Sequence, residues 1–194
     1  MISSPGEVPG VPAAVIAARR RAEVLVDVAE VQRAIDRVSV RLSLAISADN
    51  PLLLVVMNGG LPYAAELMKR LSFPLQLGYV HVARYGTATR GGALSWLNQP
   101  DYELTGRTVL LVDDVFDRGE TLAAIVAWAE QVGAGRVLTS VLVDKQVDEP
   151  RPLRIDFPAL SCPDRYLFGC GMDFQGYWRN LPAIYALPQE LESS

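Results

Sequence analysis

Three aspartates lie close together in the sequence TVLLVDDVFDRGETL, which runs from residue 108 to residue 122. Thr108 to Val112 are apolar or β-branched, so they predict a buried parallel strand. Asp113, Asp114 and Asp117 follow it, and an alanine-rich helix is expected after the glycine turn. A strand, an acidic tip, a glycine turn and a helix N-terminus in this order are typical of a phosphate site in an α/β protein.

The turn 117–121 has the groups that bind a phosphate. Backbone N–H groups without partners converge at the start of a helix, and the helix dipole adds positive potential there. Gly119 lets the backbone approach a ligand, and the Thr121 hydroxyl adds a donor. Asp113 and Asp114 would repel a phosphate, so we expect them to face ribose hydroxyls or a hydrated Mg²⁺. The alternative is an ordinary strand-to-helix turn with an acidic N-cap.

The stretch VLLVDDVFDRGETL resembles the phosphoribosyl pyrophosphate signature of type I phosphoribosyltransferases, an apolar run, two acids, two apolar residues and D-T-G-x-T. It is not a Walker phosphate loop, because G-x-x-x-x-G-K-[ST] is missing. Arg118 stands where the family commonly has Thr. The resemblance implies a site for 5-phosphoribosyl 1-pyrophosphate (PRPP) made by Asp113, Asp114, Asp117, Arg118, Gly119, Glu120 and Thr121.

A second strand–glycine–helix unit precedes this motif. Leu52 to Met57 predict a strand, and Asn58-Gly59-Gly60 follows it. By itself such a triplet is usually only a turn. Met57 to Gly60 resembles the pyrophosphate loop of hypoxanthine-guanine phosphoribosyltransferases, which contains a cis peptide. Asn58 replaces a frequent Lys, so the resemblance implies that Asn58 and Gly59 contact pyrophosphate through the backbone.

The segment from Pro163 to Tyr185, PDRYLFGCGMDFQGYWRNLPAIY, is dense in aromatic residues and glycines. Composition alone fits a plain core. It resembles the base-binding segment of 6-oxopurine phosphoribosyltransferases, P-D-[KR]-[FY]-[VL]-[VF]-G followed by [LM]-D-[YF] and [YF]-R-[DN]-L. The resemblance to the family covers about Ala22 to Leu187. It implies that Arg179 binds pyrophosphate, that Asp113 and Asp114 hold the ribose hydroxyls and a hydrated Mg²⁺, and that Asp173 orients a second Mg²⁺.

Lys145 follows the strand expected over 136–143, next to the acidic strand, so its ammonium is expected in the same crevice. A solvated surface lysine is the alternative. The resemblance implies that Lys145 donates to the purine O6, that Tyr166 stacks on the base and that the Leu167 backbone meets its edge. Asp117 is implied to take the N7 proton as a general base.

The loop from Arg84 to Gly92 lacks an apolar face and is either a plain hairpin loop or a lid that closes over the site. The family's lid carries a Ser-Tyr pair, which would be Arg84-Tyr85 here. The only histidine, His81, is interpreted as a structural residue of a strand.

Alternating strand and helix patterns place these residues in an α/β fold. With the resemblance, they predict a type I phosphoribosyltransferase-like parallel sheet flanked by helices, with a small hood from the N- and C-terminal segments.

Asp27 and Glu30 have capping-box spacing, and Gly133 is expected as the C′ residue of a helix. Helices are expected over 13–22, 28–47, after residue 60 and over 122–132, and further strands over 23–26, 75–82 and 93–98.

The 194 residues fit one phosphoribosyltransferase domain, 1–194, of which residues 1–12 are expected to be loosely ordered. A net charge of −4 argues against a general nucleic-acid binder. Cys162 and Cys170 lack zinc-type spacing and predict free thiols in a reducing cytosol. The sequence has neither a membrane-spanning apolar run nor a secretory signal, so a cytoplasmic protein is expected.

Together the residues and the resemblance predict a purine-salvage transferase that uses Mg²⁺. It would join hypoxanthine or guanine to PRPP and give IMP or GMP plus pyrophosphate. By resemblance, the enzyme would be a homodimer or homotetramer. Two alternatives remain at this point: a non-catalytic RNA-binding regulator on the same fold, and a phosphoribosyltransferase that prefers xanthine.

Overall fold

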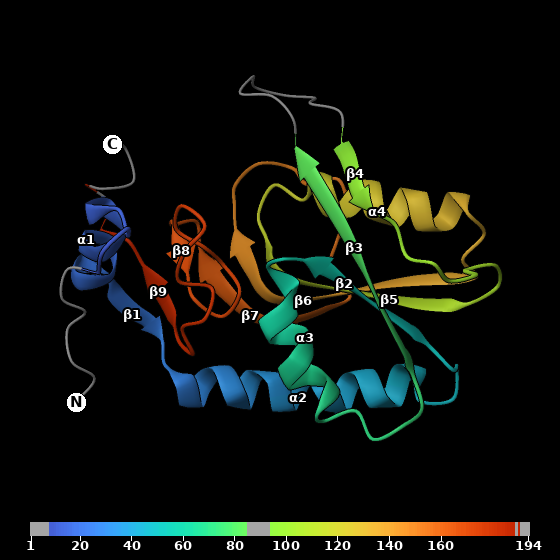
Figure 1. The fold of residues 1–194 in the computed structure, drawn as a ribbon. Coiled ribbons are helices and arrows are strands. Elements are labelled where there is room, and N and C mark those ends of the chain that lie inside the picture. Colours follow the sequence, from blue (N-terminus) through green and yellow to red (C-terminus); the bar gives the residue numbers. More distant parts are fainter. Residues whose placement is uncertain (1–7, 85–93, 189, 191–194) are drawn as a thin grey trace.

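The computed structural model describes residues 8–84, 94–188 and 190. They form a six-stranded sheet, flanked by helices and joined to a smaller three-stranded hood (Figure 1). The large sheet has the order β4-β3-β2-β5-β6-β7, in which the edge strand β4 alone is antiparallel to its neighbour. Its strands are β2 (Leu52–Met57), β3 (Gln76–Arg84), β4 (Leu94–Asn98), β5 (Thr108–Phe116), β6 (Arg136–Gln146) and β7 (Phe157–Pro163).

Helices cover both faces of this sheet, which explains why β2 and β5 are continuous apolar runs. On one face, Leu53 and Val55 pack with side chains of α2 (Val28–Ile46) and α3 (Gly60–Met68). On the other face, Leu52 and Leu54 pack with α4 (Glu120–Gln131). The expected α/β sheet is therefore confirmed, with β4 as the returning strand.

Two of the expected helix ends are confirmed. Asp27 caps α2, because its Oδ1 accepts a hydrogen bond from the Glu30 N–H at 2.7 Å. Glu30 directs its carboxylate to Arg33 and Arg37 along the helix. Gly133, just past α4, has a φ of +95°, a conformation that glycine adopts without steric cost.

The hood is made by segments near both ends of the chain. Its strands are β1 (Glu23–Val26), β9 (Ile184–Ala186) and β8 (Leu167–Phe168), in that order. The helix α1 (Ala13–Arg21) packs on them through Ala18, and the indole N–H of Trp178 donates to the Val15 carbonyl at 2.8 Å. The hood lies at one end of the large sheet, beyond β7 and the N-terminus of α2 (Figure 1).

The structure corrects three boundaries that matter for the site. β5 runs to Phe116 instead of ending at residue 112, because Asp113, Val115 and Phe116 still pair with β6. Asp113 and Asp114 are thus strand residues. β6 likewise extends to Gln146 and contains Lys145, and α4 begins at Glu120, two residues before the expected start. Among the described residues, no helix has the length and apolar character needed to cross a membrane.

Candidate active site

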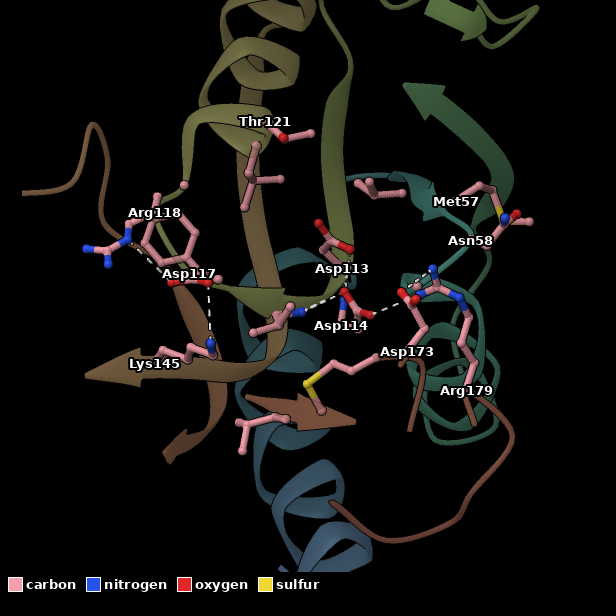
Figure 2. Close-up of a pocket in the computed structure, with 18 of the residues that line it drawn as sticks. Met57, Asn58, Asp113, Asp114, Asp117, Arg118, Thr121, Lys145, Asp173 and Arg179 are labelled. Carbon is pink, nitrogen blue, oxygen red and sulfur yellow. Dashed lines mark hydrogen bonds and ion pairs between the residues drawn. The ribbon is translucent and has the colours of Figure 1, made fainter. Parts of the chain in front are cut away.

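A cavity of about 490 Å³ lies at the carboxyl ends of β2, β5 and β6, where the hood meets the large sheet. Side chains from separate parts of the chain point into it, among them the loop after β2, the end of β5, Lys145 of β6 and the segment with Asp173 and Arg179 (Figure 2). This is the edge at which open parallel sheets bind their ligands. Its lining contains nearly all of the expected site residues: Asn58, Gly59, Asp113, Asp114, Asp117, Arg118, Gly119, Thr121, Lys145, Tyr166, Leu167, Asp173 and Arg179.

The remaining expected residues lie elsewhere or outside the described residues. Glu120 is the first residue of α4 and its side chain is exposed. Arg84 is the last residue of β3. Tyr85 and the rest of the expected lid, up to Gly92, lie outside the described residues.

The turn after β5 has the shape expected of a phosphate-binding turn. Gly119 precedes α4 with a φ of +81°, and a Cβ at this position would collide with the Phe116 ring. Only glycine therefore fits between Phe116 and the start of the helix. The backbone N–H groups in the first turn of a helix point outward from its N-terminus, so the start of α4 can bind an anion beside Thr121.

The loop after β2 is held against the acidic strand. The peptide bond between Met57 and Asn58 is cis, as in the pyrophosphate loop that this segment resembles. A Cβ on Gly59 would collide with the Asp114 carboxylate, and one on Gly60 would lie 2.5 Å from the Val112 carbonyl oxygen. The two glycines thus let the backbone of this loop approach β5 closely.

Asp113 and Asp114 form an acidic pair in which Asp114 is buried and Asp113 is partly buried. The backbone N–H of Asp114 donates to Asp113 Oδ1 at 2.9 Å, and Asp114 Oδ1 accepts from the Val115 N–H at 2.8 Å. Burial raises the pKa of Asp113 well above its usual range, and the charge of Asp114 raises it further. Burial also raises the pKa of Asp114, although the Arg179 guanidinium, 3.8 Å away, opposes that shift. Such a pair favours a ligand that brings positive charge or hydrogen-bond donors.

Asp173 is engaged with Arg179. The guanidinium Nη2 lies 2.6 Å from Asp173 Oδ1, while Asp173 Oδ2 accepts from the Gly176 N–H at 2.7 Å. Arg179 Nη1 also donates to the Gly171 carbonyl at 2.6 Å. Within the described part of the chain, no three carboxylate, histidine or cysteine side chains are arranged to hold a metal ion. Asp113, Asp114 and Asp173 therefore do not form one preformed cluster among the described residues, and their expected roles toward two Mg²⁺ ions stay predictions.

Two cations and two carboxylates form a closed ring on the opposite side of the cavity. Lys145 Nζ lies 3.3 Å from Asp117 Oδ2 and 3.6 Å from Asp164 Oδ1. Arg118 lies 3.9 Å from Asp117 Oδ1 and 3.8 Å from Asp164 Oδ2, and it forms a closer ion pair with Glu149. Lys145 is therefore paired inside the site and is not a solvated surface lysine.

Sequence reasoning did not single out Asp164 or Glu149. The structure brings Asp164 next to Lys145 because Lys145 and Cys162 are register partners in β6 and β7. Asp164 follows two residues later, at the end of that strand. The sequence signal that could have identified Asp164 is its position in the P-D-[KR]-[FY] run, two residues before Tyr166. Glu149 carries no comparable signal, since its contact with Arg118 joins two loops.

Tyr166 lies at the hood side of the cavity. Its hydroxyl donates to the Asp173 carbonyl at 3.2 Å, and its ring meets the Phe174 ring edge-on, with the centroids 5.6 Å apart. The side chain is 40% exposed, so part of the ring faces the open cavity. An aromatic face in this position suits a planar ligand.

The fold and this site define a member of a known class. Residues 22–175 match the model of the phosphoribosyl transferase domain family, and the chain belongs to that family. Among its relatives, it is similar to the hypoxanthine-guanine phosphoribosyltransferase of Streptococcus pneumoniae, with 28% identity over 89% of this chain and 96% of that protein. The Bacillus subtilis protein of the same name is 28% identical over 85% of this chain and 92% of the relative.

Solved structures share the fold. A hypoxanthine phosphoribosyltransferase from Staphylococcus aureus superposes with a TM-score of 0.85 at 20% identity, covering 92% of this chain and 98% of that one. A hypoxanthine-guanine-xanthine phosphoribosyltransferase superposes with a TM-score of 0.76 at 24% identity, covering 87% and 96%.

Proposed function

We propose that the protein is a purine-salvage enzyme that joins hypoxanthine or guanine to PRPP, giving IMP or GMP and pyrophosphate. The observation that carries this proposal is the pairing of Lys145 with Asp117, 3.3 Å apart, beside the Tyr166 ring and the phosphate-type turn. O6 and N7 are neighbouring atoms on one edge of a 6-oxopurine. An ammonium suits O6 because it only donates, and a carboxylate suits the N7 proton because it only accepts. The names of the relatives agree with this assignment.

Asp117 is the general base in this proposal. The purine N9 attacks C1 of the ribose with its electron pair, and the C1–O bond breaks, so pyrophosphate leaves with that bond's electrons. The N7–H proton passes to Asp117, which leaves a neutral base in the nucleotide product. Asp117 Oδ1 is shielded from solvent and has no hydrogen-bond partner among the described residues. A lone pair at this oxygen is consistent with accepting the proton.

The sugar and phosphates bind on the β5 and β2 sides. The start of α4, with Gly119, Thr121 and Arg118, holds the 5′-phosphate, mostly through backbone donors. The backbone at Asn58 and Gly59 receives the pyrophosphate. The Arg179 fork also pairs with pyrophosphate oxygens, a geometry that guanidinium groups favour.

The acidic pair suits Mg²⁺ binding through a substrate. Asp113 and Asp114 offer hard oxygen ligands, and burial raises the pKa of both, a cost of ionisation that a bound cation would offset. Mg²⁺ is commonly bound by one or two carboxylates together with substrate phosphates, which fits a site with no three-carboxylate cluster among the described residues. When bound, Mg²⁺ neutralises the charge of the leaving pyrophosphate as a Lewis acid. Asp173 supports this region by orienting Arg179.

The test is turnover on a panel of bases. The purified protein is incubated with PRPP, Mg²⁺ and hypoxanthine, guanine, xanthine or adenine, and nucleotide formation is followed. We expect turnover of hypoxanthine or guanine and little of adenine, because Lys145 has no acceptor for a 6-amino group. Conversion of adenine without any 6-oxopurine turnover would overturn the proposal, and turnover of xanthine alone would shift it to that base.

Two further properties are part of this proposal. A cytoplasmic location is supported by Cys162 and Cys170, which are both free and buried. A homodimer or homotetramer is supported by a similar solved structure, that of the Trypanosoma cruzi hypoxanthine phosphoribosyl transferase, described for the role of its C-terminal region in the oligomeric state. Light scattering of the purified protein measures the assembly, and a monomeric mass would exclude it.

A further inference from the structure

Lys145 has two carboxylate partners, and the proposed reaction uses only one of them. Asp117 Oδ2 lies 3.3 Å from Lys145 Nζ, and Asp164 Oδ1 lies 3.6 Å from it. The Lys145 side chain is only 11% exposed, whereas those of Asp117 and Asp164 are 45% and 41% exposed. A cation withdrawn from solvent is costly unless an opposite charge remains beside it.

The reaction removes one of those charges. If Asp117 accepts the N7 proton, its carboxylate becomes neutral at the moment when Lys145 must still donate to O6. Asp164 takes no part in the bond changes and keeps its charge. It also lies 3.8 Å from Arg118, so the same carboxylate balances the second cation of the ring.

We propose that Asp164 is a positioning residue that keeps the Lys145 ammonium paired and directed at the purine while Asp117 is protonated. This inference rests on the proposed function. The local structure supports it: Asp164 begins the turn that leads to Tyr166, in which the Arg165 N–H donates to the Pro163 carbonyl at 2.9 Å. The carboxylate that holds Lys145 and the ring that stacks on the base are therefore placed by one short segment.

A double-mutant cycle tests the inference. The variants are Asp164→Asn, Lys145→Met and their combination, and kcat/KM for hypoxanthine is measured at saturating PRPP. Asp164→Asn should lower this value roughly three- to fivefold, as expected for a partly exposed ion pair. The same change should have almost no further effect in the Lys145→Met background, because the ammonium that Asp164 is inferred to position is absent there. The KM for PRPP should stay within about twofold in Asp164→Asn.

Glu149→Gln is the matched control, since Glu149 pairs with Arg118 and has no ion pair with Lys145 among the described contacts. It should leave kcat/KM for hypoxanthine within about twofold of the unmodified protein. Asp164→Glu keeps the negative charge and should retain most of the activity that Asp164→Asn loses. Thermal unfolding of each variant checks that the fold is intact.

Three results would overturn the inference: full activity of Asp164→Asn, equal losses in Asp164→Asn and Asp164→Glu, or losses that simply add in the double variant. Each is distinct from a failure of the proposed function, which would appear as absent 6-oxopurine turnover in the unmodified protein.

Discussion

The backbone of Gly171, in the hood, lies directly against the backbone of Gly59, in the loop after β2. A Cβ on Gly171 would collide with the Gly59 carbonyl oxygen and lie 3.0 Å from Asp114 Cβ. Gly171 also has a φ of +110°, and its N–H donates to the Arg179 carbonyl at 2.9 Å. This contact joins the hood, the loop after β2 and the acidic pair of Asp113 and Asp114.

Gly171→Ala should therefore damage both stability and activity. Strain at a positive φ costs about 1–3 kcal/mol, and the added methyl group must also displace the loop at Gly59. Since small misplacements of a site can cost roughly 10²-fold in rate, we expect kcat/KM for PRPP to fall by about that factor. Steady-state kinetics and thermal unfolding measure the two effects.

Gly106→Ala is the control for this prediction. Gly106 also has a positive φ, +71°, but a Cβ there has nothing within 4 Å, and Gly106 does not line the cavity. It should show the loss of stability caused by backbone strain and little loss of activity. Equal activity in the two variants would mean that the Gly171–Gly59 contact does not position the site.

Replacing Asp117 tests the general base. Asp117→Asn preserves the shape and removes the basic oxygen, so kcat should fall by roughly 10²–10⁴-fold with a modest change in KM. Asp148→Asn makes the same chemical change at an exposed position of the next loop and should leave kcat unchanged. A near-normal kcat for Asp117→Asn would remove this residue from the base role.

Lys145 is expected to act on the purine. Lys145→Met removes the donor to O6 and should cost about 1–3 kcal/mol in kcat/KM for hypoxanthine. Lys69→Met, at an exposed lysine paired with Glu66 at the end of α3, is the matched control. If the variant impairs PRPP binding and leaves hypoxanthine KM unchanged, the proposed contact is wrong.

Arg118 is expected to contribute little to PRPP binding. Its side chain is 48% exposed and pairs with Glu149, and Gly119 and Thr121 line the cavity where the phosphate would bind. Arg118→Ala should raise the KM for PRPP by less than about tenfold, which corresponds to about 1.4 kcal/mol. It should leave kcat nearly unchanged because the 5′-phosphate is remote from the breaking bond.

Kinetics at saturating hypoxanthine measure this effect, and Arg33→Ala on α2 serves as an exposed, ion-paired control. A hundredfold rise in KM for PRPP, or a collapse of kcat, would identify Arg118 as a direct ligand whose side chain holds the phosphate.

Local signals made much of the fold predictable. The Asp27 cap, the glycine after α4 and the apolar runs of β2 and β5 each depend on a few neighbouring residues, and the structure confirms them. The meeting of the site residues in one cavity was also predictable, because parallel strands bring their carboxyl ends to one edge of the sheet.

Other features depend on partners distant in sequence and were missed. β7 contains Pro158 and Pro163, which argue against a strand in general but are tolerated at the edge of a sheet, where β7 lies. β5 continues through Asp113 and Asp114 because β6 pairs with it, although aspartate disfavours strands. The ring around Lys145 joins three separate segments, and no spacing rule in the sequence relates them.

Because the hood strands come from both ends of the chain, the large sheet is synthesised before the hood can be completed. The ribosome releases the large sheet, including the loops after β2 and β5, before it releases β9, which pairs with β1 through Glu23 and Ala186 and with β8 through Leu167. A chain interrupted ahead of β9 therefore has the part of the cavity made by β2, β5 and β6 but lacks a completed hood beside Tyr166. Joining β1 to β9 closes a loop that spans most of the protein, a step whose entropic cost places it late in assembly.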